Sequence, residues 1–361
     1  MSDDAARPVV VAYCRAGFEN EAAEDLRRLG VEDVTNGNGY VVADLGGISA
    51  DDLARRASRH APIFLRSMFV GTGPHSLTSG RGSIDRVTPL IDAMEAGGAA
   101  RVRSVWVEFP DTNEGKALSS LARALESRVE EALRTRGWFA TESALRLHVF
   151  LVDKATAYVG TSTASTGTPW PMGIPRLRMP HGAPSRSTAK LAEAFLTFLG
   201  EREPALLKPG MHAVDLGAAP GGWTWQLAQR GLKVTAVDNG ALKGDVAIDP
   251  RVKHVRADGL SWRPRSPVDW LVCDIVLQPI RIAELVADWI AAGTARHAIF
   301  NLKLPMKKRY TEVDRCRAAI DSRLKEVDSR CTLALKHLYH DREEITGFIA
   351  VEARRRERRH R

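Results

Sequence analysis

The sequence contains few cysteines and no long apolar run. Its four cysteines are spread over 361 residues, without C-x-x-C spacing and without a group of histidines beside them. We therefore expect neither a zinc site nor a disulfide framework, and we interpret Cys14, Cys273, Cys316 and Cys331 as buried thiols in a reducing compartment. No apolar segment approaches the ~20 residues of a membrane-spanning helix, and the acidic start does not resemble a signal peptide. These absences predict a cytoplasmic protein that binds no metal and no membrane.

The composition is typical of a soluble globular protein, with 44% hydrophobic and 27% charged residues. The 52 lysines and arginines outnumber the 44 acidic residues, which gives a net charge of +8 and favours a polyanionic partner or an anionic substrate. Part of this excess lies in residues 354–361, where we expect either contact with RNA or a solvated end. Nothing in the sequence indicates an obligate dimer, so we expect a monomer.

The first half of the chain predicts two α+β parts. Residues 1–70 are expected to form an N-terminal α+β subdomain, which a Gly/Ser-rich break separates from a second unit, 81–162, with its helices on one face of a sheet. The expected elements are strands at 9–14, 40–45, 63–70, 104–109, 145–152 and 156–160, and helices at 19–29, 84–96 and 116–135. Residues 163–186 are rich in Ser, Thr, Gly and Pro and form either a linker or a substrate loop. In that loop, arginines beside Trp170 and Met172 would suit phosphate contact and base stacking.

From residue 187 to 353, strands alternate with helices, which predicts an α/β domain with a doubly wound, mostly parallel sheet. The expected elements are helices at 188–199 and 312–327, and strands at 213–215, 234–238, 254–258, 270–274, 298–303, 332–338 and 345–351. Several of these strands end in an acidic or reactive residue. Because ligands of such sheets collect at the carboxyl ends of the strands, we expect the functional site there.

The most informative motif is the stretch from Asp215 to Trp223, DLGAAPGGW, between a short apolar run and a helical pattern. A carboxylate, a tight glycine turn and Pro-Gly-Gly at a helix start are how many S-adenosyl-L-methionine (AdoMet) enzymes hold their cofactor. Glycines let the backbone approach a ligand, and the helix start offers unpaired N–H groups to the methionine carboxylate, while Asp215 can meet its ammonium. The expected cofactor contacts in this stretch are Asp215, Gly217, Ala219, Pro220, Gly221 and Gly222. A dinucleotide site would require G-x-G-x-x-G spacing, and an ordinary strand-to-helix turn would need no ligand at all.

Four further residues are candidates for contacts with the same ligand: Ser187, Asp238, Asp258 and Asp274. Asp238 ends the second strand of the domain, where an acid accepts hydrogen bonds from ribose hydroxyls, and Asp258 ends the third, where it could meet the adenine amino group. Ser187 begins the helix before the first strand and is either an N-cap, a cofactor contact or both.

Lys190, Asp274, Lys303 and Glu344 could together form an active site. Methyl transfer to a ribose 2′-OH requires removal of a proton, which a neutral lysine can accept, and burial beside a second ammonium would lower the pKa of that lysine. Lys303 lies among apolar neighbours and is the expected base, Lys190 supplies the second positive charge, and Asp274 and Glu344 orient the pair. Glu343 is a weaker candidate for the last position. Each residue taken alone could also be an ordinary surface residue.

At these residues the chain resembles the ribosomal RNA large subunit methyltransferase M family. The motifs that carry the resemblance are 14–19, 172–177, 183–188, 214–217, 220–224, 237–240, 272–274, 300–310 and 338–344, which span most of the chain. The resemblance implies a THUMP-type RNA-binding domain ahead of a Rossmann-like domain, and AdoMet-dependent methylation of a cytidine 2′-OH in the peptidyl transferase region of 23S rRNA. It also implies a Lys-Asp-Lys-Glu tetrad in which Lys303 is the base.

Three alternatives stay open. The first is methylation of an RNA base, although the residues after Asp274 lack the Pro-Pro-aromatic turn of amino-group methylation, and Cys273 should point to the opposite face of its strand. The second is an rRNA-binding assembly factor that keeps the fold without the chemistry. The third is a small-molecule O-methyltransferase. The basic run 307–310 is either an RNA phosphate clamp or a solvated turn.

Overall fold

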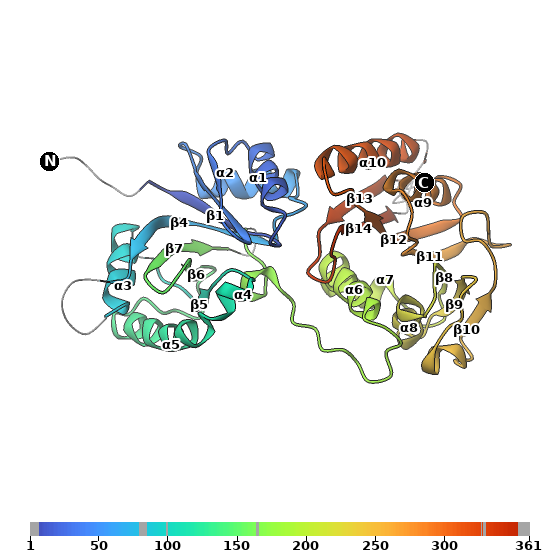
Figure 1. The fold of residues 1–361 in the computed structure, drawn as a ribbon, viewed down its shortest axis with the longest axis horizontal. Coiled ribbons are helices and arrows are strands. Elements are labelled where there is room, and N and C mark those ends of the chain that lie inside the picture. The colour runs from blue at the N-terminus through green and yellow to red at the C-terminus, as the bar shows by residue number, and fades with distance from the viewer. Residues whose placement is uncertain are drawn as a thin grey trace, which may run out of the picture. The chain divides into compact units, whose positions relative to one another are not determined.

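The computed structural model describes residues 7–78, 85–98, 100–163, 166–325, 327 and 330–352. The chain divides into two compact units, Met1–Pro175 and Arg176–Arg361 (Figure 1). The basic tail at 354–361 lies outside the described residues, so its expected role stays a prediction.

The first unit is built on one seven-stranded sheet in the order β2-β3-β1-β4-β7-β6-β5. Its elements are β1 (Val9–Tyr13), α1 (Glu19–Arg28), β2 (Val34–Asn36), β3 (Tyr40–Asp44), α2 (Ala50–Arg59), β4 (Ser67–Ser76), α3 (Val87–Ala96), β5 (Ser104–Glu108), α4 (Asn113–Lys116), α5 (Ser119–Thr135), β6 (Arg146–Leu151), β7 (Thr156–Ser162) and a short turn η1 (Pro171–Gly173).

Strand β4 runs through the Gly/Ser-rich segment where we expected a break, and it pairs with β1 on one side and β7 on the other. Gly71 on β4 lies opposite Gly160 on β7, and a Cβ at Gly71 would lie only 2.1 Å from the carbonyl oxygen of Val159. The glycines therefore allow two strands to approach closely rather than mark a linker. As a result, the segments expected at 1–70 and 81–162 share one sheet.

Helices α1, α2, α3 and α5 pack on one face of that sheet, as the sequence predicted for its second part. Helices α1 and α2 pack on Val10 and Ala12 of β1, and α3 and α5 pack on Val105 and Val149 of β5 and β6. The strand registers place all these apolar side chains on the same side. The opposite face carries an aromatic cluster, and the segment 166–174 lies on it through bonds to β5 and β6.

The second unit has a doubly wound α/β fold with the strand order β10-β9-β8-β11-β12-β14-β13. Its elements are α6 (Ser187–Ala194), η2 (Phe195–Leu199), η3 (Gly200–Arg202), α7 (Glu203–Leu206), β8 (His212–Leu216), α8 (Gly222–Gln229), β9 (Lys233–Val237), η4 (Gly244–Ala247), β10 (Val252–Val255), β11 (Val268–Cys273), α9 (Pro279–Ala291), β12 (Ala295–Lys303), α10 (Arg309–Leu324), β13 (Arg330–Lys336) and β14 (Glu344–Glu352).

The strands from β8 to β12 are parallel, and β14 is antiparallel to both β12 and β13. Helices α6 and α8 share a core cluster with the sheet, whereas α9 contacts β12 and α10 (Figure 1). Strand order reverses between β8 and β11, which is the switch point where ligands bind in such sheets. The fold class predicted from the sequence is confirmed.

Individual elements differ from the prediction. Helices α2 and α9 and strand β2 were missed, the long helix expected at 116–135 begins only at Ser119, and α10 begins at Arg309 rather than 312. Strand β10 ends at Val255, so Asp258 lies in the turn after the strand. That turn uses the Asp258 carboxylate itself, which accepts a hydrogen bond from the N–H of Leu260 at 3.0 Å.

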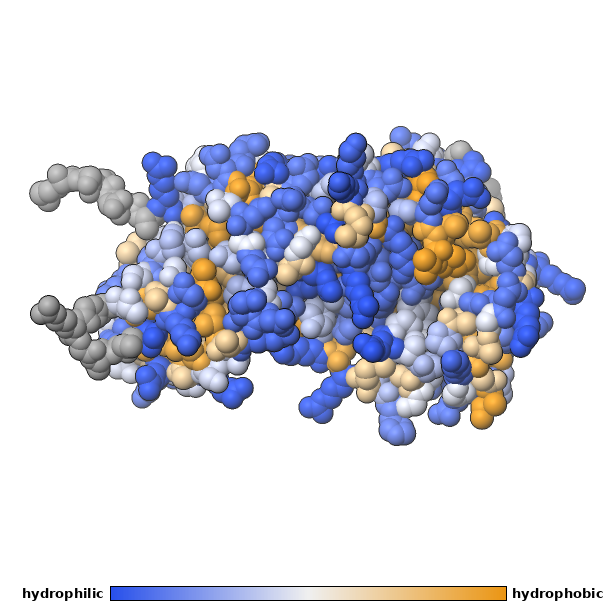
Figure 2. All heavy atoms as spheres, viewed as in Figure 1, coloured by the Kyte–Doolittle hydropathy of each residue, from blue (hydrophilic) through white to orange (hydrophobic). Residues whose placement is uncertain are grey.

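Within the described ranges, no helix is both long enough and apolar enough to span a membrane. Hydrophilic residues predominate on the face shown in Figure 2, and hydrophobic residues gather there in separate patches.

Candidate active site

The glycine motif forms the turn between β8 and α8. The N–H of Gly217 donates to the carbonyl of Val237 at 3.0 Å, and the N–H of Ala219 donates to the Asp238 carboxylate at 3.0 Å. Gly217 has φ +77° and Gly221 has φ +114°, a region that disfavours side chains. A Cβ on Gly222 would lie 2.4 Å from the hydroxyl of Ser187. The turn therefore packs against the end of β9 and the start of α6. A side chain at Gly222 would collide with Ser187.

Asp215 is the buried acid at the end of β8. Its Oδ2 accepts a hydrogen bond from the Thr224 hydroxyl at 2.6 Å, whereas its Oδ1 is buried and has no partner among the described residues. Burial raises the pKa of Asp215 to about 7, and the charges of Asp274 and Asp238 add to this effect against the Thr224 bond. Buried acceptors normally have a hydrogen-bond donor, so the Oδ1 of Asp215 is suited to accept a hydrogen bond from a bound ligand.

The other expected cofactor contacts lie around the same turn. Asp238 is half-buried and also accepts from the N–H of Gly240 at 2.7 Å. Ser187 is the first residue of α6 and its hydroxyl lies 2.7 Å from that of Ser185, so the N-cap role considered for it is wrong, because Arg186 holds the cap position. Asp258 is exposed and bonded within its own turn.

Lys190, Asp274, Lys303 and Glu344 lie in one cluster at the carboxyl end of the sheet. Lys303 Nζ lies 2.6 Å from Asp274 Oδ1 and 3.5 Å from Glu344 Oε2. Lys190 Nζ lies 3.8 Å from Asp274 Oδ2 and is hydrogen-bonded to Glu344 Oε1. Each carboxylate thus faces both lysines. The four residues come from four elements: Lys190 from α6, Lys303 from β12, Glu344 from β14, and Asp274 from the position directly after β11.

The charge state of Lys303 differs from what the sequence led us to expect. Burial lowers the pKa of Lys303, but the charge of Asp274, its hydrogen bond and the charge of Glu344 outweigh burial, so the pKa is raised above its usual value. Burial also acts against Glu344, whose pKa is nevertheless lowered by the Lys190 hydrogen bond and by both lysine charges. The expected depression of the Lys303 pKa is therefore wrong for the site without ligand, because the carboxylates of Asp274 and Glu344 lie beside Lys303 and stabilise its ammonium.

Glu344, rather than Glu343, is the acid beside the lysines. Lys303 and Glu344 are register partners on β12 and β14. The carboxylate of Glu343 instead lies 2.8 Å from Arg309, with 49% of its side chain exposed. This ion pair also engages one cation of the basic run 307–310, whose Lys307 and Lys308 are exposed.

Two residues to which the sequence analysis gave no role, Asn301 and Thr346, form a hydrogen-bonded chain that ends on Asp274. Asn301 Nδ2 donates to Asp274 Oδ1 at 3.0 Å, and the Asn301 oxygen accepts from the Thr346 hydroxyl at 2.8 Å. Both side chains are fully buried. The available signal was Asn301 itself, an amide inside the apolar run of a central strand, where a polar side chain needs a partner.

Glu193 is a third such residue, and it holds the loop that leads into Glu344. Its side chain is 2% exposed, and it accepts from the N–H groups of Tyr339 and His340 at 2.7 and 2.9 Å. Because Glu193 and Lys190 lie on α6, this clamp fixes the helix against the strand that carries Glu344.

Cysteine chemistry finds no support at this site. Cys273 is completely buried beside Asp274, and burial raises the pKa of its thiol to about 12. Cys14 and Cys316 are buried as expected, whereas Cys331 is only half-buried. A thiol with so high a pKa is a poor nucleophile.

Comparison with known proteins agrees with this geometry. Residues 85–163 match the profile described as ribosomal RNA large subunit methyltransferase M, N-terminal, and residues 183–348 match the profile of FtsJ-like methyltransferases. The chain is 46% identical over 357 residues to the ribosomal RNA large subunit methyltransferase M of Laribacter hongkongensis, covering 96% of this chain and 97% of that protein. The proteins of the same name from Methylococcus capsulatus and Thauera aminoaromatica are 46% and 44% identical, over 95% of this chain and 98% and 96% of their own lengths.

Residues 183–348 of the second unit therefore match a methyltransferase. The glycine turn, the unpartnered oxygen of Asp215 and the acid that follows β9 fit AdoMet as the methyl donor. With matches that cover nearly the entire chain, this protein belongs to the ribosomal RNA large subunit methyltransferase M family and is a methyltransferase.

Proposed function

We propose that this protein transfers the methyl group of AdoMet to the ribose 2′-OH of a cytidine in the peptidyl transferase region of 23S rRNA. The observation that carries the proposal is the cluster of two lysines between two carboxylates, with Lys303 2.6 Å from Asp274. Methylation of a hydroxyl needs a group that accepts its proton, and a lysine held at the open end of the sheet is suited to that task. The names of the relatives support ribosomal RNA as the substrate.

In this proposal Lys303 is the general base. Its raised pKa means that it rests as an ammonium, so a proton must leave Lys303 before the amine can accept the hydroxyl proton. Lys190 donates a hydrogen bond to Glu344. The positive charge of Lys190 also limits how strongly the two acids stabilise the ammonium form of Lys303. Asp274 holds the Nζ of Lys303 in place, and Asn301 donates to the same carboxylate oxygen, Oδ1, which helps to fix its position.

The residues proposed to hold AdoMet are Ser187, Asp215, Asp238, Asp258 and Asp274 together with Gly217 and the turn 219–222. When bound, AdoMet supplies an electrophilic methyl group on a sulfonium. Asp215 would bind the ammonium through its unpartnered Oδ1, and Asp238 would accept from the ribose hydroxyls. The backbone of the turn and the first N–H groups of α8 would face the carboxylate.

The RNA partner is proposed to be 23S rRNA or a large-subunit assembly intermediate, bound by a monomer in the cytoplasm. The net charge of +8 favours such a polyanion. Part of the first unit is proposed to act as a THUMP-type RNA-binding domain, in line with the N-terminal family match at residues 85–163.

The test is to map ribose methylation of 23S rRNA in cells that lack this protein. Complementation uses wild type, Lys303→Ala and, as a matched control, Lys253→Ala, which changes an exposed lysine on β10. We expect one cytidine to lose its 2′-O-methyl group in the deletion, and wild type and Lys253→Ala to restore it while Lys303→Ala does not.

Other outcomes separate the alternatives. Full restoration by Lys303→Ala would overturn the base assignment and leave the substrate intact. If a base modification disappears instead of a ribose mark, the protein is a base methyltransferase, which the buried thiol of Cys273 argues against for carbon-5 chemistry. If no modification changes while assembly is impaired, the protein acts as a binding factor.

A further inference from the structure

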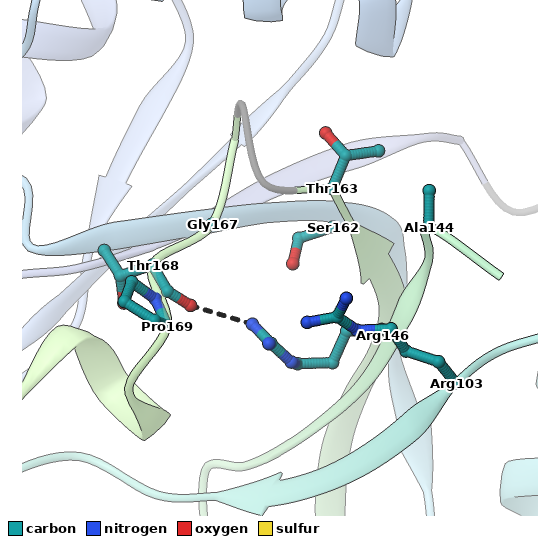
Figure 3. A pocket seen from close by; sticks show the side chains of 8 residues that line it. All are labelled: Arg103, Ala144, Arg146, Ser162, Thr163, Gly167, Thr168 and Pro169. Carbon is teal, nitrogen blue, oxygen red and sulfur yellow. Dashed lines mark hydrogen bonds between the residues drawn. The ribbon is translucent and has the colours of Figure 1, made fainter. Parts of the chain in front are cut away.

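The first unit contains a small polar pocket on the sheet face opposite its helices (Figure 3). The pocket has a volume of about 270 Å³, which is below the ~300–1,000 Å³ of typical small-molecule sites and suits a single chemical group. Arg103 and Arg146 line it with their guanidinium groups, and Ser162, Thr163 and Thr168 also line it, although the Thr168 hydroxyl donates to the carbonyl of Trp170 at 2.9 Å. Its composition is therefore that of an anion site.

Arg146 is held rigidly in this pocket. Its guanidinium lies 3.5 Å above the ring of Trp106, and its Nη1 donates to the carbonyl oxygen of Thr168 at 2.8 Å, the bond drawn in Figure 3. Its Nε donates to the Ser104 hydroxyl at 3.3 Å. Among the residues that the structure describes, the Nη2 of Arg146 has no hydrogen-bond partner, so this edge of the guanidinium is available to a ligand.

The two arginines line the same pocket. In the described part of the chain, neither Arg103 nor Arg146 forms an ion pair with a carboxylate. Burial lowers the pKa of Arg146, and the charge of Arg103 lowers it further, whereas the charge of Glu108 acts in the opposite direction. An anion placed between them would offset the charge of Arg103, and the planar guanidinium matches the oxygens of a phosphate.

A buried chain of hydrogen bonds fixes the pocket wall. Ser162 Oγ lies 2.7 Å from His148 Nε2, and His148 Nδ1 lies 2.6 Å from Glu108, which also accepts from the Tyr13 hydroxyl at 2.6 Å. The sequence Glu108–His148–Ser162 has the composition of a hydrolytic triad. However, Ser162 is only 2% exposed, and Glu108 already accepts hydrogen bonds from the Tyr13 hydroxyl and the N–H of Met172. These hydrogen bonds therefore position the Ser162 hydroxyl and do not activate it as a nucleophile.

We propose that this pocket binds one phosphodiester group of the RNA substrate, between Arg103 and Arg146. The proposal rests on the proposed function only in taking RNA as the ligand. A free phosphate offers the same oxygens, but the exposed side chain of Arg103 keeps one side of the site open to solvent, as a phosphate within a polymer requires.

The test measures binding of the full chain to unmodified 23S rRNA transcript, without AdoMet, over a series of KCl concentrations. The variants are Arg103→Gln, Arg103→Lys and the matched control Arg123→Gln, which removes the same charge from an exposed position on α5, on the other face of the sheet. For Arg103→Gln we expect the slope of log Kobs against log [KCl] to fall by about one, and Kd near physiological salt to rise about 3- to 10-fold. Arg103→Lys should keep most of the slope, and Arg123→Gln all of it.

Equal losses in Arg103→Gln and Arg123→Gln would overturn the proposal, because they would reflect net charge alone. Calorimetric titration with inorganic phosphate separates the two sources of the anion. Phosphate binding that needs Arg103, together with an unchanged RNA slope, would assign the pocket to a small anion and also overturn it. The binding experiment does not depend on methyl transfer. If the wild type failed to methylate rRNA in a separate assay, the proposed function would be rejected, but the binding data could still be interpreted.

Discussion

Lys303 and Glu344 face each other across the antiparallel pair β12 and β14, with Lys303 Nζ 3.5 Å from Glu344 Oε2. Lys303 is the last residue of β12 and Glu344 is the first of β14, so both lie where the sheet ends. A one-residue shift of this register would turn Glu344 to the other face of the sheet. The strand pairing, rather than a flexible loop, therefore sets the distance between the two charges.

Replacing Lys303 should remove most of the catalytic rate. We expect Lys303→Ala to lower kcat about 100- to 10,000-fold, the usual contribution of a general base, with little change in AdoMet affinity. Because only the neutral amine accepts a proton and the pKa of Lys303 is raised, the wild-type rate should increase with pH through the neutral and mildly alkaline range. Single-turnover rates on an rRNA transcript between about pH 6 and 9 check this, and a flat wild-type profile would contradict it.

Glu344→Gln should shift that pH profile. Removing the charge of Glu344 takes away one cause of the raised pKa of Lys303, so the rise in rate should move to lower pH. Glu343→Gln is the matched control, since Glu343 pairs with Arg309 outside the lysine cluster. The prediction is wrong if the two variants have the same profile, or if Glu344→Gln shifts the profile to higher pH.

Asn301 should act as a positioning residue. Asn301→Ala leaves the Thr346 hydroxyl without its amide acceptor and removes a hydrogen bond from Asp274, so we expect a loss of about 1–3 kcal/mol in the free energy of unfolding. Thr346→Ser keeps the hydroxyl and should stay close to wild type. Urea unfolding gives the stability, and the pH–rate profile gives the second readout. If Asn301→Ala unfolds earlier but leaves this profile unchanged, the residue is only structural.

AdoMet binding should depend on the protonation of Asp215. Its pKa of about 7 means that the carboxylate needed for an ammonium is lost as pH falls through neutrality. We therefore expect the affinity for AdoMet to increase between about pH 6 and 8. Asp215→Asn should bind at least about 10-fold more weakly and without that pH dependence. Calorimetric titration with AdoMet measures both, and an equal pH dependence in wild type and variant would refute the role of Asp215.

The raised pKa of Asp215 also predicts the pH dependence of folding without ligand. The folded protein favours the protonated form of this buried carboxyl, so its contribution to stability is complete at acidic pH and is lost as pH rises through about 7. Asp215→Asn should show a smaller decline in unfolding free energy between about pH 5 and 8. Urea midpoints at the two ends of this range, with Asp245→Asn as an exposed control on η4, measure the difference.

Much of the second unit could be predicted from local patterns. The alternation of strands and helices, the glycine turn after Asp215 and the acids at the strand ends are properties of short segments, because backbone geometry and side-chain periodicity act over a few residues. The same patterns failed where pairing partners were distant. Gly71 was taken for part of a break although it lies inside β4, because only the opposing Gly160 explains why a side chain is excluded there.

The sequence by itself determined the family, the α/β fold and the identity of the four charged residues. Only the tertiary structure decided how these residues are arranged. Lys190 and Glu344 are 154 positions apart, and the strand register that brings Glu344 rather than Glu343 to the lysines arises from pairing between β12 and β14. The raised pKa of Lys303 was likewise out of reach, because a pKa depends on burial and on charges that other segments bring within a few ångströms.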